Sequence, residues 1–218
     1  MEENTITFKI ALMQPIEEFL KASNLPDRFL IDRYLLLRGN ENDFNNGPCS
    51  IIYNNFGWGE KPRPNYIIEL LDLGCISLPT VQHVVFTIED GCITEIISQM
   101  CFQLPLDEVK AMVEPIYNSF QQAGYYLKYS QIEMTEESFV EDRPLAMLTY
   151  AQWQIAGKQD ECRYKLQIFE SDSLSDPKKY SLVFKAQVIT ETMRQTFEAR
   201  KAYRLEMQKK MNENLPKN

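Results

Sequence analysis

Acidic side chains gathered in one short stretch come closest to a spacing that could do chemistry. The stretch contains five carboxylates: Glu133, Glu136, Glu137, Glu141 and Asp142. Two carboxylates can hydrolyse a glycosidic bond or hold a divalent cation. Carboxylates in and around a short helix are more often a solvated surface, and they can also form a patch that binds a protein. The sequence favours the solvated surface and leaves the protein-binding patch and the catalytic or metal site as alternatives.

Other residue types used in catalysis and metal binding are sparse. His83 is the single histidine, so any Ser-His-Asp or Cys-His system would depend on it. The five cysteines include no Cys-x-x-Cys pair, which is the usual start of a zinc site. Glycine-rich phosphate loops and the Gly-x-Ser-x-Gly elbow are also missing from the sequence. We therefore predict no catalytic residue, no metal and no cofactor, and an enzyme built on the acidic stretch remains an alternative.

A loop that carries two large aromatic residues is a better candidate for binding. Phe56 and Trp58 alternate with Gly57 and Gly59, and prolines follow. Aromatic side chains contribute disproportionately to the energy of protein interfaces, and glycines widen the choice of backbone angles. The alternative, which the sequence favours slightly, is that Trp58 folds back onto the core and closes a long hairpin.

The charge of the chain bears on the kind of partner it would attract. The net charge is −8, with acidic residues in excess before residue 187 and basic residues in excess after it. An acidic surface repels phosphate backbones, which argues against nucleic acid, and it attracts a basic partner. Solubility alone is an equally good explanation of the charge.

The elements that would position these residues are predicted from turns and periodicity. The clearest signal is a hairpin over 81–102 around the two-residue turn Asp90-Gly91. Simple alternation from that turn pairs Val84 with Ile97 and leaves Glu95 as the one charged residue on an apolar face. Further strands are expected at 5–12, 49–53, 66–71, 125–134, 145–155, 163–169 and 180–188, and helices at 15–22, 26–37, 105–123 and from Thr135 to about Asp142.

The end of the chain is expected to form a long helix over 190–212. Its apolar stripe weakens towards the C-terminus, where basic residues follow, and Arg200 and Arg204 are therefore candidate partner contacts. A frayed, solvated end is the alternative. We predict one domain over 1–218 with an α+β fold, namely a mainly antiparallel sheet with helices packed on it and a long C-terminal helix.

No targeting or membrane-spanning segment is evident in the sequence. The start of the chain is acidic, unlike a secretory signal or a transit peptide. The longest uncharged apolar run, 73–88, is shorter than the ~20 residues that a membrane helix needs. The expected location is the cytoplasm, without membrane contact.

In general character the chain resembles the small acidic α+β immunity proteins that bacteria encode beside their toxins, including those of type VI (contractile) secretion systems. The resemblance covers the Asp90-Gly91 hairpin, the helix that ends in Ala123-Gly124-Tyr125 and the late strands around Trp153. It implies a protein-binding toxin inhibitor that forms a tight complex with a toxin or effector domain of basic surface. A cytosolic adaptor or chaperone that binds through the 190–212 helix is the alternative from outside that class.

Overall fold

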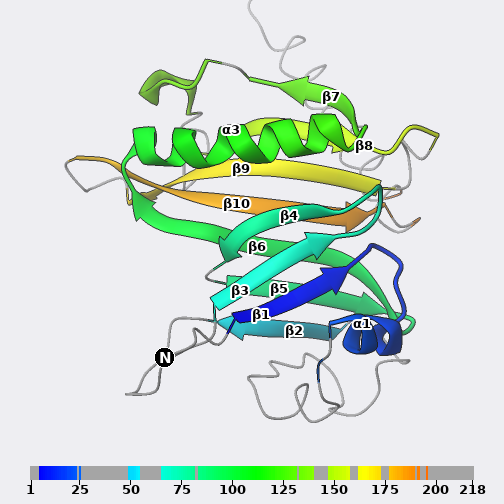
Figure 1. Cartoon of the computed structure of the whole chain (residues 1–218). Helices are drawn as coiled ribbons and strands as arrows, with labels where there is room; N and C mark the ends of the chain where they lie inside the picture. Colours follow the sequence, from blue (N-terminus) through cyan, green and yellow to red (C-terminus); the bar gives the residue numbers. More distant parts are fainter. Residues whose placement is uncertain are drawn as a thin grey trace, which may run out of the picture. The chain divides into compact units, whose positions relative to one another are not determined.

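The computed structural model describes residues 5–23, 25, 49–54, 65–81, 83–131, 133–139, 147–157, 162–172, 177–189, 191 and 195 (Figure 1). The chain divides into two compact units, residues 1–188 and 189–218, and all of the named strands lie in the first. Several expectations lie outside the described residues, namely the 26–37 helix, Phe56, Trp58, Glu141, Asp142, Arg200, Arg204 and all of the 190–212 helix except Glu191 and Gln195.

Sheet is the dominant structure of the described residues. The larger sheet has seven strands in the order β2-β5-β6-β10-β9-β8-β7, and all neighbouring strands are antiparallel. These strands are β2 (Cys49–Asn54), β5 (His83–Glu89), β6 (Cys92–Leu104), β7 (Tyr126–Ser130), β8 (Met147–Gln154), β9 (Cys162–Asp172) and β10 (Lys179–Val188).

A smaller sheet has the strand order β1-β3-β4, made by β1 (Thr5–Ile10), β3 (Asn65–Leu70) and β4 (Ile76–Val81). Strands β1 and β3 run parallel, the one departure from antiparallel pairing among the described strands. Strand β4 was not predicted from the sequence, and it contains Pro79. Proline cannot donate to a sheet ladder, and it is tolerated here because β4 is an edge strand.

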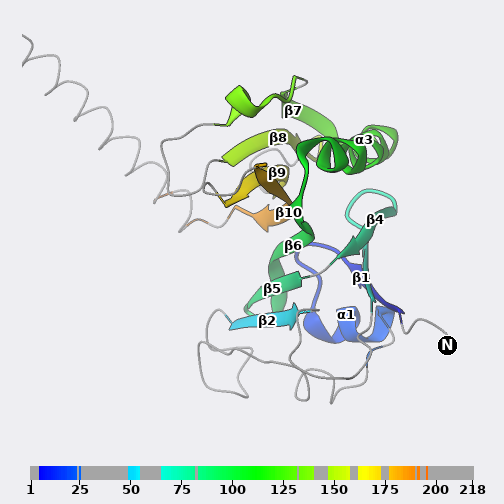
Figure 2. The ribbon, with the colours of Figure 1, turned by 90° about the vertical axis from the view of Figure 1, so that its left-hand side faces the viewer.

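The small sheet and two helices cover one face of the large sheet. Helix α1 (Ile16–Ala22) and the small sheet lie over β5 and β6, and helix α3 (Leu106–Gln122) lies over β8, β9 and β10 (Figures 1 and 2). The ring centroids of Phe8 and Phe86 are 5.3 Å apart, and those of Phe120 and Trp153 are 4.4 Å apart. Each covering layer thus joins the large sheet through buried aromatic rings.

Helix α3 forms where the spacing of apolar residues predicts it. Val109, Val113, Ile116 and Phe120 recur at helical intervals and are all buried. Gly124 follows the helix with a φ of +84°, a conformation that favours glycine and ends the helix. The predicted helix over 105–123 is therefore confirmed to within one residue at each end.

The β5–β6 hairpin is confirmed at its turn and corrected along its strands. Asp90 and Gly91 both have positive φ, as a tight two-residue turn requires, and Ile88 pairs with Ile93. Thr94 is then an extra residue, so Thr87 pairs with Glu95 and Val84 pairs with Ser98. This bulge moves Glu95 off the apolar face, and the charged exception that simple alternation predicted does not exist.

The predicted α+β fold class, with several helices packed on a sheet, is wrong for the described residues, which are mostly sheet. The described residues contain ten strands but only two α-helices and one 3₁₀ turn, and they contain no long C-terminal helix. Long strands contribute to the large share of sheet, because β6, β9 and β10 have 13, 11 and 10 residues. The acidic helix predicted to run from Thr135 towards Asp142 is, in its described part, a single 3₁₀ turn, Glu136–Ser138.

Candidate protein-binding groove

A groove of about 520 Å³ opens between helix α3 and strand β8. Its polar and aromatic lining comes from three separate segments of the chain. The helix contributes one flank, the segment before the 3₁₀ turn contributes Met134, and β8 contributes Tyr150. The lining residues are Lys110, Val113, Glu114, Tyr117, Asn118, Met134 and Tyr150.

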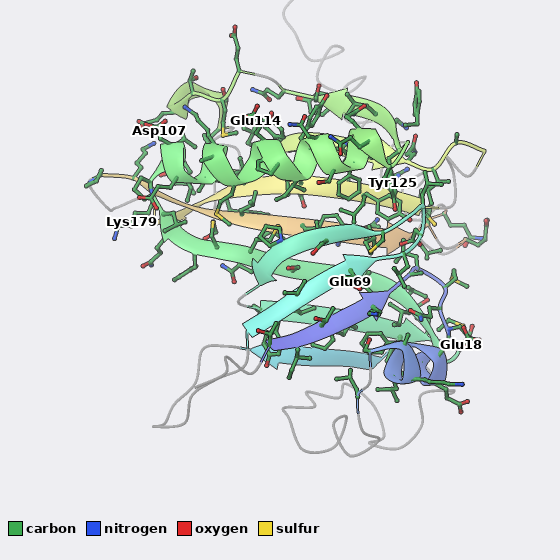
Figure 3. The ribbon with its side chains drawn as sticks, in the orientation of Figure 1. Glu18, Glu69, Asp107, Glu114, Tyr125 and Lys179 are labelled. Carbon is green, nitrogen blue, oxygen red and sulfur yellow. The ribbon has the colours of Figure 1, made fainter. Side chains whose placement is uncertain are left out.

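The helical flank follows from the period of the α-helix. Lys110, Glu114 and Asn118 are four residues apart, so they lie on one side of α3. Lys110 Nζ is 3.2 Å from Asp107 Oδ1, so this cation already has a partner. Glu114 is exposed and forms no ion pair within the described part of the chain. Figure 3 shows its side chain on the side of α3 that faces β7.

Two tyrosine rings contribute to the lining of the groove. The rings of Tyr117 and Tyr150 meet edge to face with centroids 6.1 Å apart, and Tyr117 also lies 5.8 Å from the ring of Trp153. Tyr150 is the extra residue of a bulge in β8, because Thr149 pairs with Gln167 and Ala151 with Leu166. The bulge lets Ala151 and Trp153 enter the core while Tyr150 remains partly exposed beside α3.

The surroundings of Tyr150 favour the neutral form of its phenol. Burial is the main reason that the pKa of Tyr150 is raised, and the nearby Tyr117 and Glu114 add to the effect. A neutral phenol keeps its O–H as a hydrogen-bond donor. The lining therefore offers a carboxylate acceptor, hydroxyl groups and aromatic faces, which are groups that contact a cationic side chain well.

The acidic stretch singled out in the sequence begins beside this groove. Met134 and Phe139 are buried and anchor the segment, whereas Glu133 and Glu136 are exposed. Thr135 and Ser138 exchange capping contacts around the 3₁₀ turn. The side chain of Glu137 lies outside the described residues, as do Glu141 and Asp142. The structure thus sets Glu133 and Glu136 next to Met134, a lining residue that sequence reasoning did not identify.

Strand β7 offers a second surface at the edge of the large sheet. Among the described strands it pairs only with β8. Leu127 is opposite Trp153 on the core side, and a bulge at Lys128 places Tyr126 and Tyr129 opposite Gln154 and Gln152. Both tyrosines are exposed, at 56% and 48%. Exposed tyrosines on an edge strand are typical of surfaces that bind other proteins.

The remaining chemical candidates are spread over separate elements. His83 is half-buried on β5, and burial lowers its pKa. Cys101 and Cys162 are buried and form no disulfide, and burial raises the pKa of Cys101. No three His, Cys, Asp or Glu side chains lie close enough together to hold a metal ion in the part of the chain that the structure describes.

Comparison with known proteins gives no match to this chain among family models, curated proteins or solved structures. Within the described ranges, no helix has the length and apolar character to cross a membrane.

The residues that line the groove come from separate parts of the sequence, and only some of them could be recognised there. Lys110, Glu114 and Asn118 are visible in the sequence as one polar side of the helix predicted over 105–123. Tyr150 is not distinguishable from its strand neighbours, because its position depends on a bulge that only the pairing of β8 with β9 determines. The sequence also places Tyr117 and Tyr150 far apart, and no local pattern joins them.

Proposed function

We propose that this chain works by binding another protein, and that the groove between α3 and β8 receives a basic side chain of the partner. The observation that supports this proposal is the combination of an unpaired, exposed Glu114 with the rings of Tyr117 and Tyr150. A lysine or arginine in the groove would pair with the carboxylate and lie against an aromatic face. Asn118 supplies a further polar contact on the same helix side.

The partner we propose is a bacterial toxin or effector domain with a basic surface, which the chain neutralises in a tight complex. The net charge of −8 suits such a partner, because opposite charges accelerate association. Inhibition of this kind needs a stable fold and a complementary surface but no catalytic residue. The resemblance to immunity proteins of type VI secretion systems supports the same partner class.

A pull-down with tagged full-length chain from its native host tests the proposal. We expect one basic protein, captured in near-equal amount and identified by mass spectrometry. That protein should be harmful when expressed alone, and co-expression of this chain should restore growth. Both effects should be lost with Glu114→Lys, which places a cation in the groove.

Glu18→Lys is the matched control because it makes the same charge change at an exposed site on α1 (Figure 3). It should capture the partner as the wild type does. A folded bait that captures no partner at low and moderate salt would contradict the whole proposal. A partner that Glu114→Lys captures equally well would move the interface away from the groove.

A further inference from the structure

The large sheet has a second face, opposite α3, on which three basic residues gather. Strand β9 buries Tyr164 and Leu166, and β10 buries Phe184 and Ala186, all on the side of the core. Alternation along each strand therefore places Arg163, Lys165 and Lys185 on the other side, here called the outer face. This concentration of cations runs against the acidic charge of the whole chain.

Two of these cations are direct neighbours across the sheet. Lys165 of β9 is paired in register with Lys185 of β10. Like charges placed opposite each other on adjacent strands destabilise a sheet. A counter-ion placed between the two ammonium groups would relieve this repulsion.

One carboxylate on the outer face neutralises only one member of the pair. Glu95 Oε1 is 2.6 Å from Lys185 Nζ, and Thr87 Oγ1 donates to Glu95 Oε2 at 3.2 Å. Lys165 has no carboxylate within ion-pair distance in the described residues. Burial, Arg163 and Lys185 lower the pKa of Lys165, in that order of importance. Lys165 is thus a half-buried cation whose described neighbours add positive charge.

A neutral hydrogen-bond donor lies beside the two lysines on the outer face. Gln152 of β8 is in register with Lys165, so an amide and two ammonium groups stand side by side on three adjacent strands. Adjacent strands are about 4.8 Å apart, and a single tetrahedral oxyanion can therefore contact neighbouring side chains of the row. Lys185 retains partial access to solvent, with 28% of its side chain exposed.

We propose that the outer face binds a doubly charged phosphate group between Lys165 and Lys185, with Arg163 and Gln152 beside it. A dianion matches the charge of the two lysines better than a single carboxylate does, because Glu95 pairs with Lys185 and leaves Lys165 without a carboxylate partner in the described residues. Bound phosphate removes the repulsion between the two lysines and provides Lys165 with its missing partner. The group belongs either to free phosphate or to a phosphate monoester. This site is independent of the groove on the opposite face.

Titration of the full-length chain with sodium phosphate at constant ionic strength tests the proposal. The melting temperature and the heat of binding are the two readouts, and acetate is the matched carboxylate titrant. We expect saturable phosphate binding with a rise in melting temperature that follows mass action. Phosphoserine, run in parallel, distinguishes the sources, since a monoester site binds it more tightly than inorganic phosphate and a free-phosphate site does the reverse.

Lys165→Gln should weaken phosphate binding about tenfold or more, because one charge-assisted contact is lost. Lys179→Gln makes the same charge change at an exposed position of β10 (Figure 3) and should leave the affinity unchanged. In the absence of phosphate, Lys165→Gln should melt at or above the wild-type temperature, which separates lost binding from lost folding. Equal losses in the two variants, equal affinity for acetate, or no saturable binding by the wild type would each overturn the proposal.

Discussion

At the scale of the residue, the buried hydroxyl of Tyr180 is expected to lower the stability of the fold, and mutation can test this. Its side chain is 1% exposed, and its hydroxyl has no hydrogen-bond partner within the described residues. Burial raises the pKa of Tyr180 to about 12, and Glu136 and Glu170 contribute. The ring itself is well placed, with its centroid 4.8 Å from that of Phe139. The ring therefore stabilises the fold and the hydroxyl does not.

We predict that Tyr180→Phe leaves the free energy of unfolding unchanged at pH 7 or raises it by up to about 1 kcal/mol, because the ring stays and an unpaired hydroxyl is removed. The pH dependence should also change. A raised pKa means that the unfolded chain loses this proton first, so wild-type stability falls as pH rises from 10 towards about 12. Urea unfolding at pH 7 and above pH 10 measures both effects. A lower stability of the variant at pH 7 would show that the hydroxyl has a partner.

At the scale of the element, helix α3 contains a residue that weakens it. Pro115 lies inside the helix, is exposed, and removes one backbone hydrogen-bond donor from the helical ladder. Ser119 Oγ donates to the Pro115 carbonyl at 2.9 Å, and this bond does not replace the donor that proline lacks. Helix α3 forms one wall of the groove. Pro115 directly follows Glu114, the residue on which the proposed binding depends.

Pro115→Ala is predicted to raise the free energy of unfolding by about 1–3 kcal/mol, because alanine restores the donor and suits a helix interior. Thermal or urea unfolding of the two proteins gives the difference. Ala111→Gly, an exposed change on the same helix, should act in the opposite direction by about 1 kcal/mol. A Pro115→Ala protein less stable than the wild type would mean that the proline is needed for the local path of the helix.

Elements with strong local signals were predictable from sequence, and those set by pairing were not. The Asp90-Gly91 turn and the apolar stripe of α3 are local, and both are confirmed. The bulges at Thr94 and Tyr150 depend on how distant strands pair, so simple alternation misplaced Glu95 and gave Tyr150 no special role. The parallel pairing of β1 with β3 joins segments far apart in sequence and has no local signature.

In the candidate site, too, residues close together in the sequence could be recognised, whereas contacts between distant segments could not. The acidic stretch could be recognised in the sequence from its closely spaced acidic residues. In the structure, Glu133 and Glu136 are exposed beside the buried Met134. The groove itself was not visible, because Tyr117 and Tyr150 come together only when α3 packs against β8. A surface assembled from three segments leaves no motif in any one of them.

At the scale of the whole molecule, the charge is arranged on two faces of the large sheet. The groove on the α3 side carries the unpaired carboxylate of Glu114, and the outer face carries Lys165 and Lys185. The two proposals therefore differ in the sign of the ligand, and each has its own variants. Added salt should weaken a complex formed through Glu114, because screening reduces the attraction between exposed charges.

The central claim, binding of a basic partner in the groove, is tested most directly by titration calorimetry of the captured partner against Glu114→Gln and the wild type. We predict a dissociation constant about tenfold higher or more for Glu114→Gln, because the partner's cation loses its carboxylate. Glu18→Gln on α1 should bind as the wild type does. Identical affinities for wild type and Glu114→Gln, with both proteins folded, would contradict the account and place the interface on another surface.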